Sequence, residues 1–62
     1  MNAAAVLTRQ WIEVGPVTYY RKVYDDGRID LYERSGDAGG YQRRPISPDD
    51  WDELAAKHEV QS

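Results

Sequence analysis

The sequence predicts an α+β domain: a small antiparallel sheet of three or four strands, with one C-terminal helix packed on a face of the sheet. Its 62 residues hold a single domain, 1–62, because a chain this short buries only about 60% of its unfolded surface. Two runs of aromatic and β-branched residues flank Asp25-Asp26-Gly27, and an amphipathic stretch follows Ser47-Pro48. Parallel strands need long crossovers, for which the chain has no room, so we expect antiparallel pairing.

The first strand is predicted over Leu7–Val14, which contains Trp11 and Ile12 and ends before the break at Gly15-Pro16. The segment Ala3–Gln10 is equally compatible with a helical turn. Strand and helix therefore both stand as readings of the N-terminal segment.

A β-hairpin is predicted from Val17–Tyr24 and Ile29–Glu33, joined by Asp25-Asp26-Gly27. A two-residue turn would mix apolar and charged side chains on each face of the hairpin. A three-residue loop, with its glycine in the left-handed region, keeps them apart. We therefore expect the three-residue loop, which sets Tyr24 opposite Arg28.

The three-residue loop sorts the hairpin side chains onto two faces. The inner face is apolar, with Arg21 at its margin, and consists of Val17, Tyr19, Val23, Ile29 and Leu31. The outer face carries tyrosines and cations: Tyr20, Lys22, Tyr24, Arg28, Tyr32 and Arg34. On it we expect a Lys22–Asp30 salt bridge and a Tyr20–Tyr32 aromatic pair, each contributing about 0.2–1 kcal/mol.

The end of the chain is predicted as a loop, a strand and a helix. Ser35–Gly40 is a flexible loop by composition, and Tyr41–Arg44 is a short strand ended by Pro45. Ser47 is the expected helix N-cap, with Pro48 at the first helical position and Asp50 closing a capping box.

At 100° per residue the two faces of this helix differ in character. Trp51 and Leu54 dock on the sheet, with Ala55 and His58 on the same face. The outer face is acidic and consists of Asp49, Asp52, Glu53 and Glu59. Glu53 and Lys57 form a favourable i,i+4 pair.

The composition bounds the cofactors, the oligomeric state and the compartment. The chain has no cysteine and one histidine, so disulfides, thiolate chemistry and zinc are not expected, and no cofactor or metal is predicted. Because so small a domain usually needs stabilisation beyond its own core, such as disulfides, a metal or a second chain, we favour a homodimer. The apolar run Ala3–Leu7 is too short for a signal peptide or a membrane span, and we expect a cytoplasmic protein without membrane contact.

No residue pattern indicates catalysis. His58 is the only side chain that titrates near neutrality when unperturbed, and no Ser, Thr or Asp is spaced to form a triad with it. The acidic residues after Ser47 lack the spacing of a calcium loop and suit a helix N-terminus. We therefore expect a binding protein and not an enzyme.

Charge and residue type favour a protein partner over nucleic acid. Net charge is −3, and residues 47–62 carry all of the net acidity. The six arginines to two lysines match the residue types enriched at interface hot spots, and the pI near 4.9 is far from that of nucleic-acid binders. The alternative is a small nucleic-acid-binding or transcription-regulating protein that uses Arg21, Arg28, Arg34, Arg43 and Arg44.

In size, acidity and lack of cysteine and catalytic motifs, the whole chain resembles phage-encoded inhibitors of bacterial defence, above all the anti-CRISPR proteins. No signature motif carries this resemblance. It implies an inhibitor of a larger nucleic-acid-processing complex, such as a CRISPR-Cas nuclease. The acidic helix face, as a DNA mimic, would then compete for the basic DNA-binding groove of that complex.

Overall fold

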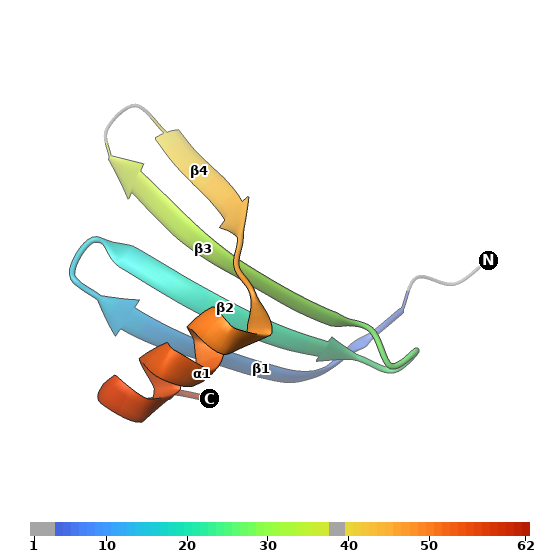
Figure 1. Ribbon diagram of the computed structural model, residues 1–62. Coiled ribbons are helices and arrows are strands. Elements are labelled where there is room, and N and C mark those ends of the chain that lie inside the picture. The colour runs from blue at the N-terminus through green and yellow to red at the C-terminus, as the bar shows by residue number, and fades with distance from the viewer. Residues whose placement is uncertain (1–3, 38–39) are drawn as a thin grey trace.

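The computed structural model describes residues 4–37 and 40–62, which form a four-stranded antiparallel sheet and one helix (Figure 1). The elements follow the order β1 (Val6–Val14), β2 (Val17–Tyr24), β3 (Ile29–Asp37), β4 (Gly40–Pro45) and α1 (Pro48–Lys57). Neighbours in sequence are neighbours in the sheet, in the order β1-β2-β3-β4. The predicted α+β class is confirmed.

The N-terminal segment is a strand from Val6 onward, so the helical alternative for Ala3–Gln10 is wrong over that part. β1 pairs with β2 along almost its whole length, from Val6 opposite Tyr24 to Val14 opposite Val17. Val6–Gln10 includes the β-branched residues Val6 and Thr8, and the pairing with β2 decides for the strand because intrinsic propensity is a weak prior beside tertiary contacts.

The β2–β3 hairpin has the predicted three-residue loop. The N–H of Tyr24 donates to the carbonyl of Arg28 at 2.9 Å, and the N–H of Gly27 donates to the carbonyl of Tyr24 at 3.0 Å. Gly27 has a φ of 87°, in the region that only glycine adopts without strain. The register sets Tyr20 opposite Tyr32, as the side-chain pattern predicts.

The predicted loop Ser35–Gly40 is wrong over Ser35–Asp37, which continues β3, and Gly40 already belongs to β4. The rest of that loop lies outside the described residues. Cross-strand packing explains the difference: a Cβ at Gly36 would overlap the ring of Tyr41, its partner on β4. The glycine therefore leaves room for an aromatic ring and does not mark a break in the strand.

Helix α1 begins as predicted. The Oγ of Ser47 accepts a hydrogen bond from the N–H of Asp50 at 3.1 Å, and a carboxylate oxygen of Asp50 accepts from the N–H of Ser47 at 3.3 Å. The ammonium of Lys57 donates to Glu53 at 3.0 Å. The two contacts between Ser47 and Asp50 satisfy N–H groups that the start of a helix leaves free.

The helix ends at Lys57, two residues before the end of the predicted helical pattern at Glu59. His58 is the C-cap, with an extended backbone, and its side chain is exposed and not packed against the sheet as expected. Glu59 lies beyond the helix, so it does not belong to the outer helical face. The extrapolation at 100° per residue does not apply past the last helical residue.

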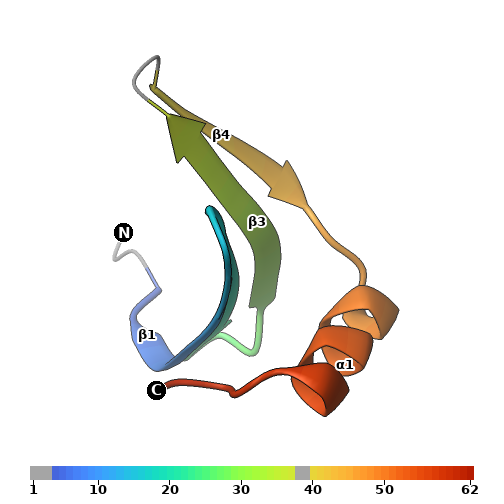
Figure 2. The ribbon, with the colours of Figure 1, turned by 90° about the vertical axis from the view of Figure 1, so that its left-hand side faces the viewer.

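Only three side chains are buried among the described residues: Ile12, Tyr32 and Trp51. Ile12 and Trp51 belong to the layer between the sheet and α1, which lies on one side of the sheet (Figure 2). Tyr32 lies on the opposite face, which carries no helix in the described part of the chain. After α1 the chain returns to β1, where Gln61 pairs with Trp11.

Candidate functional site

The sheet face opposite α1 gathers tyrosines and cations from three strands. Side chains alternate along a strand, so residues two apart share a face, and paired residues on neighbouring strands share it too. We call this surface the tyrosine–cation face, which consists of Tyr20, Lys22, Tyr24, Arg28, Tyr32, Arg34, Tyr41 and Arg43.

Two stacked tyrosines form the centre of the face. The rings of Tyr20 and Tyr32 lie 5.0 Å apart between centroids, at an interplanar angle of 21°. The ammonium of Lys22 lies over both rings, 5.8 Å from the centroid of Tyr20 and 5.2 Å from that of Tyr32. The guanidinium of Arg43 lies 3.8 Å from the centroid of Tyr32. These neighbours leave Tyr32 only 7% exposed, although no helix covers it within the described residues.

Two further guanidinium–tyrosine contacts flank this centre. Arg28 lies 4.5 Å from the ring centroid of Tyr24, at the hairpin end, and Arg34 lies 3.8 Å from that of Tyr41. A cation within about 6 Å of a ring centroid is attracted by the ring's quadrupole. The described residues of this 62-residue chain contain five such contacts, all on one face.

The expected Lys22–Asp30 salt bridge is wrong, although the two residues are paired in the register as predicted. The carboxylate of Asp30 accepts from Arg43 of β4 at 2.7 Å, and Lys22 lies over the tyrosine rings. The planar guanidinium reaches Asp30 while it stacks on Tyr32, a combination that an ammonium cannot make. Arg43 is thereby held from two sides.

The six predicted residues of the hairpin face lie together, and Tyr41 and Arg43, which are not among the predicted residues, lie on the same face. The sequence does contain a pattern that indicates these two residues. Tyr41–Arg44 was already predicted as a strand, and its alternation puts Tyr41 and Arg43 on one face. Only the pairing of β4 with β3 shows which face that is.

The predicted acidic surface is less concentrated than the tyrosine–cation face. Its four members, Asp49, Asp52, Glu53 and Glu59, are all exposed. Glu53 is paired with Lys57, and Glu59 lies outside the helix. First-turn acids also stabilise a helix by themselves, through its dipole. Asp49 and Glu53 therefore have structural roles that need no partner.

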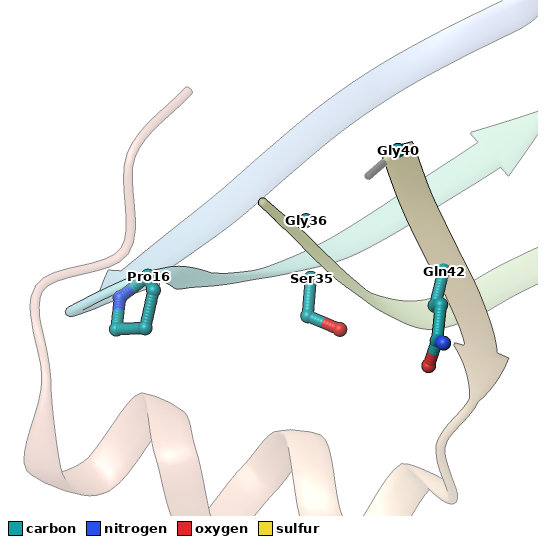
Figure 3. A pocket seen from close by; sticks show the side chains of 5 residues that line it. All are labelled: Pro16, Ser35, Gly36, Gly40 and Gln42. Atoms are coloured by element: carbon teal, nitrogen blue, oxygen red, sulfur yellow. The ribbon is translucent and has the colours of Figure 1, made fainter. Parts of the chain in front are cut away.

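Three hollows lie on the α1 side of the sheet. One of about 350 Å³ lies at the β1–β2 turn, where the side chains of Pro16, Ser35 and Gln42 point into it (Figure 3). None of the described residues that line it is ionisable. A second, of about 470 Å³, lies between α1 and the sheet, and its lining combines apolar residues such as Ile29 and Trp51 with the charged residues Arg21, Asp30 and Asp52. A third, of about 360 Å³, is lined by His58 among others.

Within residues 4–37 and 40–62, no three His, Asp or Glu side chains gather as a metal site would need. No helix there is both long enough and apolar enough to span a bilayer. The fold and this surface define a small α+β domain with a preordered layer of tyrosines and cations. No family model, curated protein or solved structure matches the chain.

Proposed function

We propose that the protein is a non-enzymatic protein-binding module that uses the tyrosine–cation face to bind an acidic surface of a larger protein. The observation that carries the proposal is the set of five cation–π contacts on a face that no described helix covers. Tyrosine and arginine dominate interface hot spots because they combine large contact area with hydrogen-bond donors.

The arginines of this face are ordered before any partner binds. A guanidinium that already stacks on a ring loses little further side-chain entropy when it binds a carboxylate, and this lowers the cost of association. The Arg43 side chain is 59% exposed despite its contacts with Tyr32 and Asp30. Its outer N–H groups therefore remain accessible to an acidic partner.

A protein partner is favoured over single-stranded nucleic acid because most rings of the face already have a ring or a cation against one side, whereas Tyr41 stays 74% exposed. Nucleic-acid binders of this kind offer open aromatic faces on which bases stack. Here Tyr20 and Tyr32 stack on each other, and cations lie over Tyr24 and Tyr41.

Such a module acts by occupying a surface, and it inhibits its partner when that surface has another ligand. The anti-defence role implied by the resemblance is of this kind. Competition for a basic DNA-binding groove, however, would use the acidic helix residues in place of the tyrosine–cation face. The two surfaces therefore imply partners of opposite charge, and one experiment separates them.

The test uses a photo-crosslinking amino acid in place of Tyr24 to capture and identify the partner in bacterial cells. Calorimetry with the purified partner then compares the parent with an Arg28→Glu/Arg34→Glu variant and with an Asp49→Lys/Asp52→Lys control. We expect a loss of affinity of about tenfold or more for the arginine variant alone, since each reversal places like charges together.

Two outcomes would overturn the proposal. Loss of binding in the Asp49→Lys/Asp52→Lys variant alone would move the site to the acidic surface. Micromolar binding of single-stranded DNA or RNA that weakens steeply with salt, measured by electrophoretic shift, would assign the face to nucleic acid. Circular dichroism of each variant establishes that the fold is kept.

A further inference from the structure

We infer that the free edge of β4 is a docking strand for an extended, acidic segment of the partner. The inference rests on the proposed function, because Tyr41 and Arg43 belong both to this edge and to the tyrosine–cation face. It adds the form in which the partner binds: a strand that pairs with the sheet through its main chain, as in β-augmentation.

The two edges of the sheet differ. At the β1 edge, Trp11 and Gln61 exchange two main-chain hydrogen bonds, of 3.0 and 2.8 Å, so the C-terminal segment covers part of that strand. At the other edge, β4 (Gly40–Pro45) is exposed at every residue, and no described segment pairs with its outer side. Exposed edge strands are templates for a further strand.

The ladder shows which main-chain groups of β4 are free. The N–H of Ile46 donates to the carbonyl of Leu31 at 3.2 Å. Hydrogen bonding alternates along an antiparallel strand, so Arg44 and Gln42 direct their main-chain groups toward β3 in the same way. Tyr41 and Arg43 then direct their N–H and C=O groups away from the sheet. Pro45 has no N–H and so limits the docking strand at its C-terminal end.

The charged side chains of β4 indicate which side chains a pairing strand would carry. Arg43, which pairs with Asp30, extends from the tyrosine–cation face and Arg44 from the α1 face, so each side of the edge presents a guanidinium. The Arg44 side chain is 73% exposed, and its only ion pair among the described residues is a contact of 3.8 Å with Glu33. A strand with acidic side chains on both of its faces would lie against both arginines.

A second copy of the chain fits this edge poorly. Antiparallel self-pairing would bring the Arg43 and Arg44 of a second copy near those of the first, and repulsion among the four guanidinium groups opposes it. The homodimer favoured by chain length therefore gains no support at β4. The charges at this edge favour an acidic segment of a different protein as the strand that pairs with β4.

The position of the edge also joins it to the proposed binding face. A residue that exchanges hydrogen bonds with Tyr41 or Arg43 places its side chain on the same face as its partner. Acidic side chains at these positions would continue the tyrosine–cation face by one strand. Partner binding would then combine main-chain pairing at β4 with carboxylate contacts to the arginines.

The probe is a capped seven-residue peptide of glutamate and threonine, titrated into the ¹⁵N-labelled protein, with a lysine–threonine peptide as charge control. We expect the glutamate peptide to shift the amide resonances of Tyr41 and Arg43 and to slow their hydrogen exchange. The lysine peptide should leave both unchanged. Tyr41→Pro removes one outward N–H and should weaken binding about tenfold relative to the matched Tyr41→Ala variant.

Binding with no change at the two edge amides, or equal affinity for the Tyr41→Pro and Tyr41→Ala variants, would overturn the docking strand. So would self-association of the parent through β4, or no peptide binding at all. None of these results would contradict the proposed function. That function is tested separately, by the Arg28→Glu/Arg34→Glu variant and the captured partner. If Tyr41→Pro does not fold, the amide shifts and exchange rates of the parent still decide.

Discussion

Trp11 and Gln61 exchange two main-chain hydrogen bonds, N–H of Trp11 to the carbonyl of Gln61 at 3.0 Å and the reverse at 2.8 Å. The side-chain amide of Gln61 also donates to a carboxylate oxygen of Glu13 at 3.1 Å. The C-terminal segment therefore acts as a one-residue strand on β1, and it brings the chain back to the sheet after α1. Because few side chains of the domain are buried, this main-chain pairing contributes to holding α1 against the sheet.

Replacing Gln61 by proline should lower the free energy of unfolding by about 1 kcal/mol, because the donor to the carbonyl of Trp11 is lost. Gln61→Ala removes only the exposed side-chain bond to Glu13 and should cost less. Urea unfolding followed by tryptophan fluorescence measures both variants. Equal stability of the two would mean that the main-chain pairing contributes nothing.

Gly27→Val should destabilise the hairpin by about 1–2 kcal/mol, because the φ of 87° is strained for any residue with a Cβ and most of all for a β-branched one. Gly27→Asn is the matched control, since asparagine tolerates the left-handed region better than other residues. Thermal unfolding by circular dichroism ranks the three proteins. A valine variant as stable as the parent would contradict the loop geometry.

These elements show what was predictable from sequence. The β2–β3 hairpin and the start of α1 depend on local chemistry: a glycine with positive φ, and a serine three residues before an aspartate. Both predictions are confirmed. The alternation of the hairpin then places the six predicted residues of the tyrosine–cation face together, because side-chain direction follows from register alone.

Contacts between distant segments were not predictable in the same way. The Arg43–Asp30 ion pair and the Trp11–Gln61 pairing depend on which strands become neighbours, and no local pattern encodes that. The composition of Ser35–Gly40 predicted a loop because glycine usually weakens a strand. In the fold, Gly36 is the residue that makes room for the Tyr41 ring.

Gly36→Ala should lower stability by about 1–3 kcal/mol, since the added methyl group overlaps the ring of Tyr41 and must displace it. Tyr41→Ala removes the ring and with it the overlap. A double-mutant cycle over the two positions should therefore give a coupling energy of at least about 0.5 kcal/mol in urea unfolding. Strict additivity of the two substitutions would contradict this packing.

Reversal of the four acidic residues Asp49, Asp52, Glu53 and Glu59 to lysine distinguishes the two candidate surfaces. The fold should survive because all four side chains are exposed. Stability should fall by a few tenths of a kcal/mol to about 1 kcal/mol for each first-turn acid, through the helix dipole, and the Glu53–Lys57 pair is lost with Glu53.

Affinity for the acidic partner of the tyrosine–cation face should be kept, and at low salt raised, because the added positive charge attracts that partner at long range. Calorimetry at two salt concentrations checks this, and a collapse of binding in a folded variant would assign the function to the acidic surface.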